Sequence, residues 1–247
     1  MEKRKAVNLI FPHQLFEKSD LLDNTCETYL IEEYLFFNHF KFHKQKIAFH
    51  RASMKAYADF LKSQNVSVKY IEATEMKSDI RVLLEKILAS GTAQINFYDP
   101  VDSWLLKRLN SFSDRLQLNM LETPYFINTN EDLSTFFRAD KKSFFQTTFY
   151  KQQRVKHNVL MEKDGNPRGG KWTYDVDNRK KYPKGQQPPE IQFPNSSPYW
   201  EEAIQYVGTY FKDYPGSLDA KRIYPITFEE TSDWLVRFLK ERFEEFG

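Results

Sequence analysis

The sequence predicts an α/β fold, in which a parallel five-stranded sheet has helices on both faces and is followed by an extended linker and C-terminal helices. Two observations predict it. In the first half of the chain, short apolar runs alternate with longer segments whose apolar residues recur every three or four positions, which is typical of β-α units with parallel strands. Further along, six of the eleven prolines fall between Asp164 and Pro198, which indicates an extended segment and not another β-α unit.

Five segments are predicted to be strands because each is a short apolar run or is apolar at alternate positions. The crossovers between them should be right-handed, and ligands of such sheets bind beyond the carboxyl ends of the strands. The residues that follow each strand are therefore the first candidates for a site. The predicted strands are Val7 to Phe11, Thr28 to Glu32, Val66 to Ile71, Gln94 to Tyr98 and Leu116 to Leu121.

The helices are predicted from an apolar face at helical spacing, as with Ile47, Met54 and Leu61 in the longest of them. Two helices are expected to close the chain. The last of these begins at Thr227, where Glu230 three residues later completes the pattern of a capping box. The predicted helices with bounds are 44–64, 78–89, 102–112, 143–157 and 227–246.

The composition limits the class of protein. With 247 residues, 22 Phe and 14 Tyr, the chain can build a packed core, and a net charge of +2 does not by itself indicate a nucleic-acid binder. The single cysteine, Cys26, excludes an internal disulfide and a four-cysteine metal cluster. The sequence has no signal-peptide pattern and no apolar run of the ~20 residues that a membrane span needs, so a cytoplasmic protein is expected.

Three regions are predicted along the chain. Residues 1–140 form an α/β domain, residues 141–200 form a helix and an extended basic linker, and residues 201–247 form helices. Neither an internal repeat nor a low-complexity tract is evident.

Polar residues at the strand ends are the candidate ligand contacts. His13 and Gln14 form a donor and acceptor pair that could bind the polar edge of a flat heterocycle, or could simply cap their loop. Glu32 could accept a hydrogen bond from a ribityl or ribose hydroxyl, or could be a solvated strand end. No G-x-G-x-x-G follows the first strand, so the usual dinucleotide phosphate loop is not predicted.

Aromatic and basic residues follow the second strand. The rings of this segment could wall a pocket or meet a partner domain. A metal site is not predicted from His39, His43 and His50, because no carboxylate is spaced to be a further ligand. The residues predicted to bind a cofactor are His13, Gln14, Glu32, Tyr34, Phe36, Lys44 and Asp99.

The marked basic concentration of the chain lies in the linker, interleaved with aromatic rings that could stack on an opened duplex. The alternative is a solvated loop. The residues predicted to contact DNA are Arg154, Lys171, Trp172, Arg179, Lys180 and Lys181.

Three stretches carry a resemblance to a known family. They are HKQKIAFHRASM at 43–54, FYK continuing to HNVLM at 149–161, and GGKWTYD followed by DNRK at 169–180. In their order and spacing they resemble the photolyase-related proteins of bacteria, the iron–sulfur bacterial cryptochromes and photolyases. The resemblance covers essentially the whole chain.

The resemblance implies a Rossmann-like antenna domain that can hold a lumazine-type chromophore, and a linker to a helical domain that holds FAD and an iron–sulfur cluster. In that family the whole protein is a lyase that uses blue light to repair (6-4) lesions in DNA. This chain ends where the helical FAD domain would begin. FAD, the iron–sulfur cluster and catalysis are therefore expected only in that absent half. DNA is expected to be a partner through the parent protein. The chain alone is expected to be inactive.

The chain departs from the family at the antenna site. Pro12, His13 and Gln14 stand where members usually have glycine, aspartate and glutamine, and Phe36 stands where lumazine-binding members have a glutamate. No G-x-S-x-G or H-E-x-x-H motif supplies a catalytic residue. Two alternatives stay open, namely a nucleotide-binding α/β protein that acts alone and a non-catalytic DNA-binding module. Absorbance near the violet edge would distinguish an antenna protein from both.

Overall fold

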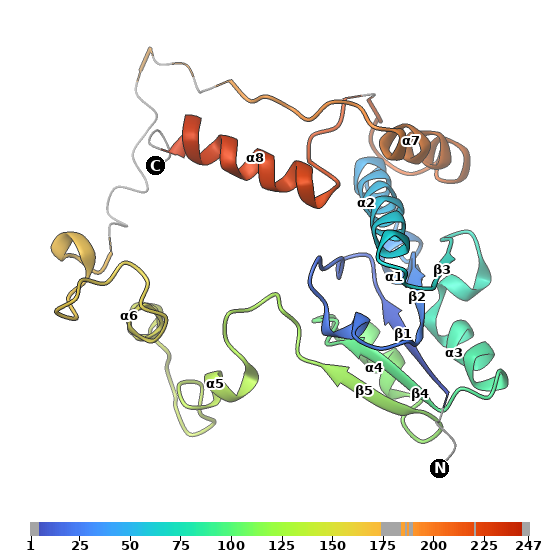
Figure 1. The fold of residues 1–247 in the computed structure, drawn as a ribbon, viewed down its shortest axis with the longest axis horizontal. Helices are drawn as coiled ribbons and strands as arrows, with labels where there is room; N and C mark the ends of the chain where they lie inside the picture. The colour runs from blue at the N-terminus through green and yellow to red at the C-terminus, as the bar shows by residue number, and fades with distance from the viewer. Residues whose placement is uncertain (1–4, 174–183, 186, 188–189, 220, 244–247) are drawn as a thin grey trace. The chain divides into compact units, whose positions relative to one another are not determined.

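The computed structural model describes residues 5–173, 184–185, 187, 190–219 and 221–243. The chain divides into two compact units, drawn in Figure 1. The first, Met1–Thr123 with Ile191–Glu241, is called the sheet unit below. The second, Pro124–Glu190 with Arg242–Gly247, is called the inserted unit because most of it interrupts the first.

The sheet unit contains a five-stranded parallel sheet in the order β3-β2-β1-β4-β5, which confirms the predicted fold class. The prediction of a strand at Gln94–Tyr98 is confirmed in full. The prediction that the third strand begins at Val66 is wrong, because the Val66 N–H donates to Leu61 O in the turn that ends the preceding helix. The strands are β1 Ala6–Ile10, β2 Glu27–Ile31, β3 Val68–Ile71, β4 Gln94–Tyr98 and β5 Gln117–Leu121.

Most helices of this unit begin where a side chain accepts a hydrogen bond from the first turn. Asp79 and Asp102 cap their helices in this way, so these helices start one residue after the caps, slightly later than predicted. The α-helices of the sheet unit are α1 Tyr34–Phe37, α2 Lys44–Ser63, α3 Ile80–Ala89, α4 Ser103–Asn110, α7 Pro198–Tyr210 and α8 Phe228–Glu241. The 3-10 turns are η1 Asp20–Leu22 and η2 Met76–Ser78.

The predicted capping box at Thr227 is half confirmed. Thr227 Oγ1 accepts a hydrogen bond from the Glu230 N–H, but the Glu230 carboxylate bonds Arg222 and the Ile226 N–H. Helix α8 ends at Glu241, and the predicted end at Phe246 lies outside the described residues.

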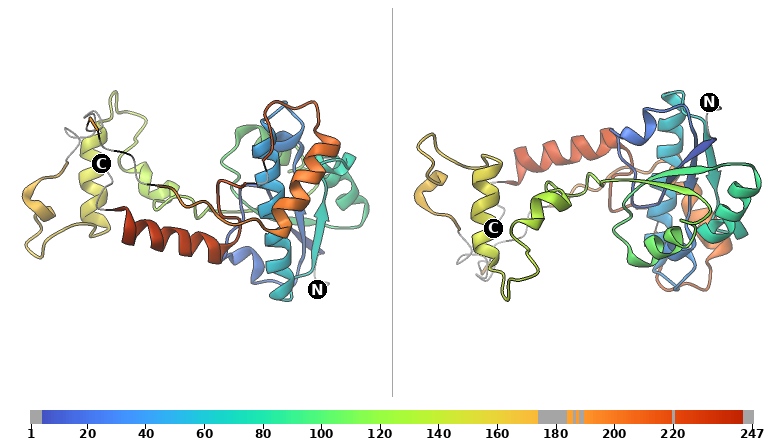
Figure 2. Two further views of the ribbon diagram at one scale, coloured as in Figure 1. Left: turned by 90° about the horizontal axis from the view of Figure 1, so that it is seen from above. Right: turned by 90° about the horizontal axis from the view of Figure 1, so that it is seen from below.

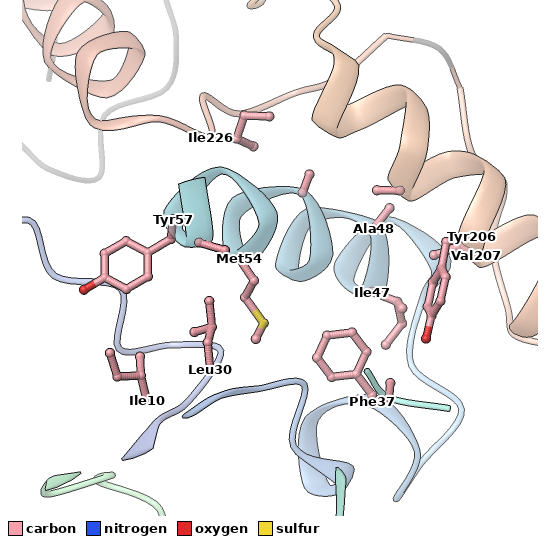
Figure 3. Packing of buried hydrophobic residues seen from close by; sticks show 14 of the residues in the cluster. Ile10, Leu30, Phe37, Ile47, Ala48, Met54, Tyr57, Tyr206, Val207 and Ile226 are labelled. Atoms are coloured by element: carbon pink, nitrogen blue, oxygen red, sulfur yellow. The ribbon is translucent and has the colours of Figure 1, made fainter. Parts of the chain in front are cut away.

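Two apolar clusters hold the sheet between layers of helices. On one face α2 and α7 lie side by side, as both views of Figure 2 show. Their side chains pack with Leu30, Phe37 and Met54 into one cluster, seen in Figure 3. On the other face α3 and α4 pack against β1 and β4 through residues such as Leu84 and Leu105. Burial on both faces explains why the central strands β1 and β4 are mostly apolar, whereas the edge strand β5 is largely exposed.

The inserted unit contains α5 Asn130–Ser134, α6 Gln146–Lys156 and the turn η3 Arg168–Gly170. Its rings gather into one cluster made by Phe136, Phe137, Phe144 and Phe149, with centroids 4.9 to 6.2 Å apart. Across the described ranges of both units, none of the helices is both long and apolar enough to cross a bilayer.

Candidate functional site

The strand order places a topological switch between β1 and β4, because the chain leaves β1 toward β2 on one side and returns to β4 on the other. The loops that follow these two strands are bonded to each other. His13 Nε2 lies 2.8 Å from Pro100 O, and Gln14 Nε2 donates to Asp99 O at 2.9 Å. The structure therefore brings together three of the predicted cofactor contacts, His13, Gln14 and Asp99.

Gln14 has one buried polar atom without a partner. Its side chain is 2% exposed, its amide nitrogen donates to the carbonyls of Tyr98 and Asp99, and its Oε1 accepts no hydrogen bond in the described part of the chain. A buried acceptor without a donor costs about 1–3 kcal/mol. A ligand N–H or O–H at the switch point would remove this cost.

The loop after β4 is strained at the same place. Val101 has φ of 51°, in the left-handed region that a β-branched side chain rarely adopts. Asp99 Oδ1 holds this conformation by accepting the Val101 N–H at 2.9 Å. Both Val101 and Trp104, three residues later, are about half exposed. Strain of this kind is concentrated at functional sites in proteins.

Phe36 occupies the space between two histidines. Its ring centroid lies 4.7 Å from that of His13 and 6.4 Å from that of His50. Burial lowers the pKa of His50 to about 4, with a further contribution from the positive charge of Lys46. The His50 imidazole is therefore neutral at physiological pH, and this part of the edge offers rings and neutral polar atoms.

Glu32 is fully buried and makes its bonds inside the protein. Its carboxylate accepts from Tyr70 Oη at 2.6 Å, from the Ala73 N–H at 2.7 Å and from Arg51 at 3.0 Å. Burial raises its pKa, against the lowering effect of Arg51. Since both carboxylate oxygens have partners here, Glu32 can reach a ligand hydroxyl only by sharing these bonds.

Arg51 organises the surrounding charges. Its guanidinium lies 2.8 Å from Glu72 and 2.5 Å from Glu202, and its centre is 3.3 Å from the Tyr206 ring centroid. Glu202 and Tyr206 belong to α7, so this network ties α7 to the carboxyl ends of β2 and β3. Its role in the sheet unit is structural.

A second group of charges lines a pocket of about 380 Å³ beside α4. Trp104 and His39 form one wall, with ring centroids 5.0 Å apart, and Arg108 forms another. The Arg108 guanidinium lies 3.2 Å from the buried carboxylate of Glu33, whose pKa burial raises to about 7. The pocket thus combines aromatic faces with cationic groups.

Two further predicted cofactor contacts lie elsewhere at this edge. Tyr34 faces the Arg108 guanidinium at 5.7 Å, next to the pocket beside α4. The Lys44 N–H donates to Pro215 O at the start of α2, so its backbone connects two segments of the sheet unit. Their contact with a cofactor stays a prediction.

In the inserted unit Arg154 is buried. Its guanidinium donates to the carbonyls of Val159, Leu160 and Trp172, which holds the loop after α6. Lys171 is exposed beside Trp172. The predicted DNA contacts Arg179, Lys180 and Lys181 lie outside the described residues.

Sequence reasoning placed Glu33 at a strand end without giving it a role, and it did not identify Arg51, Arg108 or Trp104 as members of this edge. Arg51 carried one local signal, namely a charge within an otherwise apolar stretch of helix, but its partners are distant in the sequence. Within the described ranges, no group of three or more histidine, cysteine, aspartate or glutamate side chains could hold a metal ion.

Comparison with known proteins agrees with this architecture. The model of the deoxyribodipyrimidine photo-lyase-related protein family matches residues 8–223. An uncharacterized protein, R852, of Acanthamoeba polyphaga mimivirus is 36% identical over 192 residues, which are 72% of this chain and 96% of that protein. A (6-4) photolyase of Agrobacterium fabrum is 23% identical over 145 residues, which are 56% of this chain but only 28% of the photolyase.

The family match covers most of the sheet unit. It also covers the whole of Pro124–Glu190, the main part of the inserted unit. The likeness to the (6-4) photolyase is distant and partial, and the likeness to the mimivirus protein extends over almost the whole of that relative. The chain therefore belongs to the deoxyribodipyrimidine photo-lyase-related protein family.

Proposed function

We propose that the sheet unit is an antenna domain that holds a planar heterocyclic chromophore at the switch point between β1 and β4, and that it serves light-dependent repair of (6-4) lesions in DNA. The observation that carries the proposal is the buried Oε1 of Gln14, which has no donor at the place where α/β sheets bind their ligands. Lumazines, pterins and flavins present ring N–H or ribityl O–H donors that suit this acceptor.

The surroundings of Gln14 support a flat, conjugated ligand. The Phe36 ring lies against His13 in the loop after β1, and Trp104 lines the pocket beside α4, which has about the minimum volume of a small-molecule site. Stacking on such rings stabilises a planar chromophore and keeps it rigid. This domain would absorb light and transfer excitation, and no residue of the edge acts as an acid, base or nucleophile in the proposal.

The chemistry of repair would need FAD and, in the family that the sequence resembles, an iron–sulfur cluster. With Cys26 as its one cysteine, this chain does not fit a cluster with four cysteine ligands. We therefore assign no step of repair to its residues, and electron transfer to the lesion would occur in a partner domain.

Reconstitution tests the antenna proposal. The full chain would be mixed with a ribityllumazine, and binding would be followed by the shift of the violet absorption band and by quenching of its fluorescence. Replacing Gln14 with leucine removes the acceptor and should weaken binding by roughly 5- to 150-fold, since a ligand donor left buried without an acceptor costs about 1–3 kcal/mol. Trp104→Ala should weaken binding without disturbing the core, because Trp104 is half exposed.

The matched control is Gln64→Leu, the same change at an exposed position at the far end of α2. Thermal unfolding of each variant would show whether it is folded. The antenna proposal is wrong if the folded chain binds none of a lumazine, a pterin or a flavin, or if both site variants bind as the control does.

A second function, DNA contact by the inserted unit, is favoured by one observation. Lys151 and Lys171 are exposed near Trp172, and the Lys151 ammonium lies 5.6 Å from the ring centroid of Trp172. We assign phosphate contact to these two lysines together with Arg168, whereas Arg154 is occupied by backbone carbonyls. Replacing all three by alanine should flatten the log–log salt dependence of duplex binding by up to about 2.7, at roughly 0.9 per phosphate contact.

Fluorescence anisotropy with a labelled duplex at several salt concentrations would measure that slope. The same titration should be made with Arg179, Lys180 and Lys181 replaced by alanine, for which the sequence predicts a loss of up to about three units. If neither set of substitutions changes the affinity or the slope, the basic linker is a solvated loop.

A further inference from the structure

A second pocket, of about 380 Å³, is lined by none of the predicted cofactor contacts. It is formed by the first turns of α2, by Trp200 of α7 and by residues 221–224. Its exposed wall area is mainly apolar, and its lining includes the rings of Phe49, Trp200 and Tyr224 and the imidazole of His43. Phe49 and Tyr224 meet edge to face, with centroids 5.8 Å apart.

The charge of this pocket is positive. Lys46 and Lys221 line it, and none of the residues that line it is acidic. Arg222 also lines it, but its guanidinium is neutralised by a bidentate pair with Glu230 at 2.5 and 2.6 Å. Both lysines are exposed, so their charges are accessible to an anion that enters the pocket.

Each of the two ammonium groups lies against a ring that does not itself line the pocket. Lys46 Nζ lies 3.6 Å from the centroid of Phe42, and Lys221 Nζ lies 3.9 Å from the centroid of Phe193. Cation–π contacts of this kind reduce the freedom of a lysine side chain without neutralising its charge. The pocket lining thus combines two lysines whose side chains are held by neighbouring rings with the aromatic side chains of Phe49, Trp200 and Tyr224.

The start of α2 cannot bind the anion through its backbone. The Lys44 N–H donates to Pro215 O, and the Gln45 N–H donates to His43 Nδ1 at 3.1 Å. The next two amides donate to His43 O. Recognition of an anion here therefore depends on the lysine side chains, and not on a free helix N-terminus.

The geometry points to a binding site for a small planar aromatic anion, such as an aromatic carboxylate, with its rings between Phe49, Trp200 and Tyr224 and its acid group between Lys46 and Lys221. This site is separate from the proposed chromophore site and does not depend on it. The aromatic walls exclude water from the rings of the ligand, and the carboxylate oxygens accept hydrogen bonds from the two ammonium groups.

Calorimetric titration of the full chain with 2-naphthoate tests the site, and 2-naphthylmethanol serves as the neutral ligand of the same shape. Naphthoate should bind more tightly than the alcohol. Lys46→Gln and Lys221→Gln should each weaken naphthoate binding by roughly 1.5- to 5-fold, the range for partly exposed ion pairs, and should leave the alcohol unaffected. Tyr224→Ala should weaken both ligands.

Lys62→Gln is the matched control, since Lys62 belongs to the same helix but lies outside the pocket. Circular dichroism would verify that each variant is folded. The inference is overturned if the folded chain does not bind naphthoate, or if the two lysine variants bind it as the control does. It is also overturned if Trp104→Ala, and not Tyr224→Ala, removes binding, because the probe would then occupy the pocket beside α4.

Discussion

Replacing Arg51 with methionine should destabilise the sheet unit strongly. The change keeps much of the apolar stem but removes the guanidinium that lies 3.0 Å from Glu32, whose carboxylate is fully buried. Breaking a buried ion pair by removing one partner costs about 3–5 kcal/mol. The contacts with Glu72 and Glu202 add little, because those carboxylates are partly exposed.

We expect a loss near the lower end of that range, about 3 kcal/mol, because Tyr70 and the Ala73 N–H still donate to Glu32. For a domain of this size, each 1 kcal/mol lowers the melting temperature by roughly 2–4 °C, so the Tm should fall by roughly 6–12 °C. Differential scanning calorimetry of the full chain would measure it. Arg115→Met is the matched control, since Arg115 pairs with Glu85 at the surface and its loss should leave the Tm nearly unchanged.

The pH dependence identifies the cause. Burial holds the pKa of Glu32 above its ordinary value, and loss of Arg51 raises it further. An acid whose pKa is higher in the folded state holds its proton there at pH values where the unfolded chain has lost it. The stability of the variant therefore falls as pH rises above about 4.5, and its deficit should be smaller at pH 5 than at pH 8.

A double variant with Glu32→Gln as well removes the buried charge, and it should recover at least about 1 kcal/mol relative to Arg51→Met. The argument from an uncompensated buried carboxylate fails if Arg51→Met has the same melting temperature as the Arg115→Met control. It also fails if the loss of stability caused by Arg51→Met does not change with pH.

Two further predictions concern single residues of the sheet unit. Gly216→Ala should lower the Tm by more than Gly91→Ala. Both glycines have φ near 80–90°, but only at Gly216 would an added Cβ collide with the His43 ring, 2.0 Å away. Equal losses of Tm in thermal melts would contradict this prediction. Glu33→Gln should flatten the decline of stability between pH 4.5 and about 7, by at most about 1.4 kcal/mol per pH unit, because burial raises the Glu33 pKa to about 7 against the pull of Arg108. Urea titrations at several pH values would measure the slope, and parallel curves for the two proteins would refute the assignment.

Local patterns were sufficient to predict the parallel sheet, because its strands are short segments that are apolar throughout or at alternate positions and are separated by helical patterns. They were weaker at the ends of elements. Val66 is apolar and precedes a strand, yet its N–H completes the last turn of α2. Helix α1, four residues long, gave no periodic signal at all.

The site was harder to predict than the fold, because its contacts join residues far apart in the sequence. His13 and Gln14 were identified as strand-end residues, and the structure places them against Asp99 and Pro100. The partnership of Arg51 with Glu202 spans 151 residues, and no local pattern in either segment indicates the other. Such long-range contacts form only because α7, which follows the inserted unit in the sequence, packs against α2.

The return of the chain to the sheet unit has a consequence for biosynthesis. The sheet unit is interrupted after Thr123 and resumes at Ile191, so α7 reaches the ribosome exit long after α2. At about 5–20 residues per second, the 147 residues between the end of α2 and the end of α7 take roughly 7–29 s to synthesise. During that interval the face of α2 that α7 covers is exposed to other chains and to chaperones. Slower translation of the inserted unit should therefore reduce the yield of folded protein in the cell, even though no bond of the finished molecule has changed.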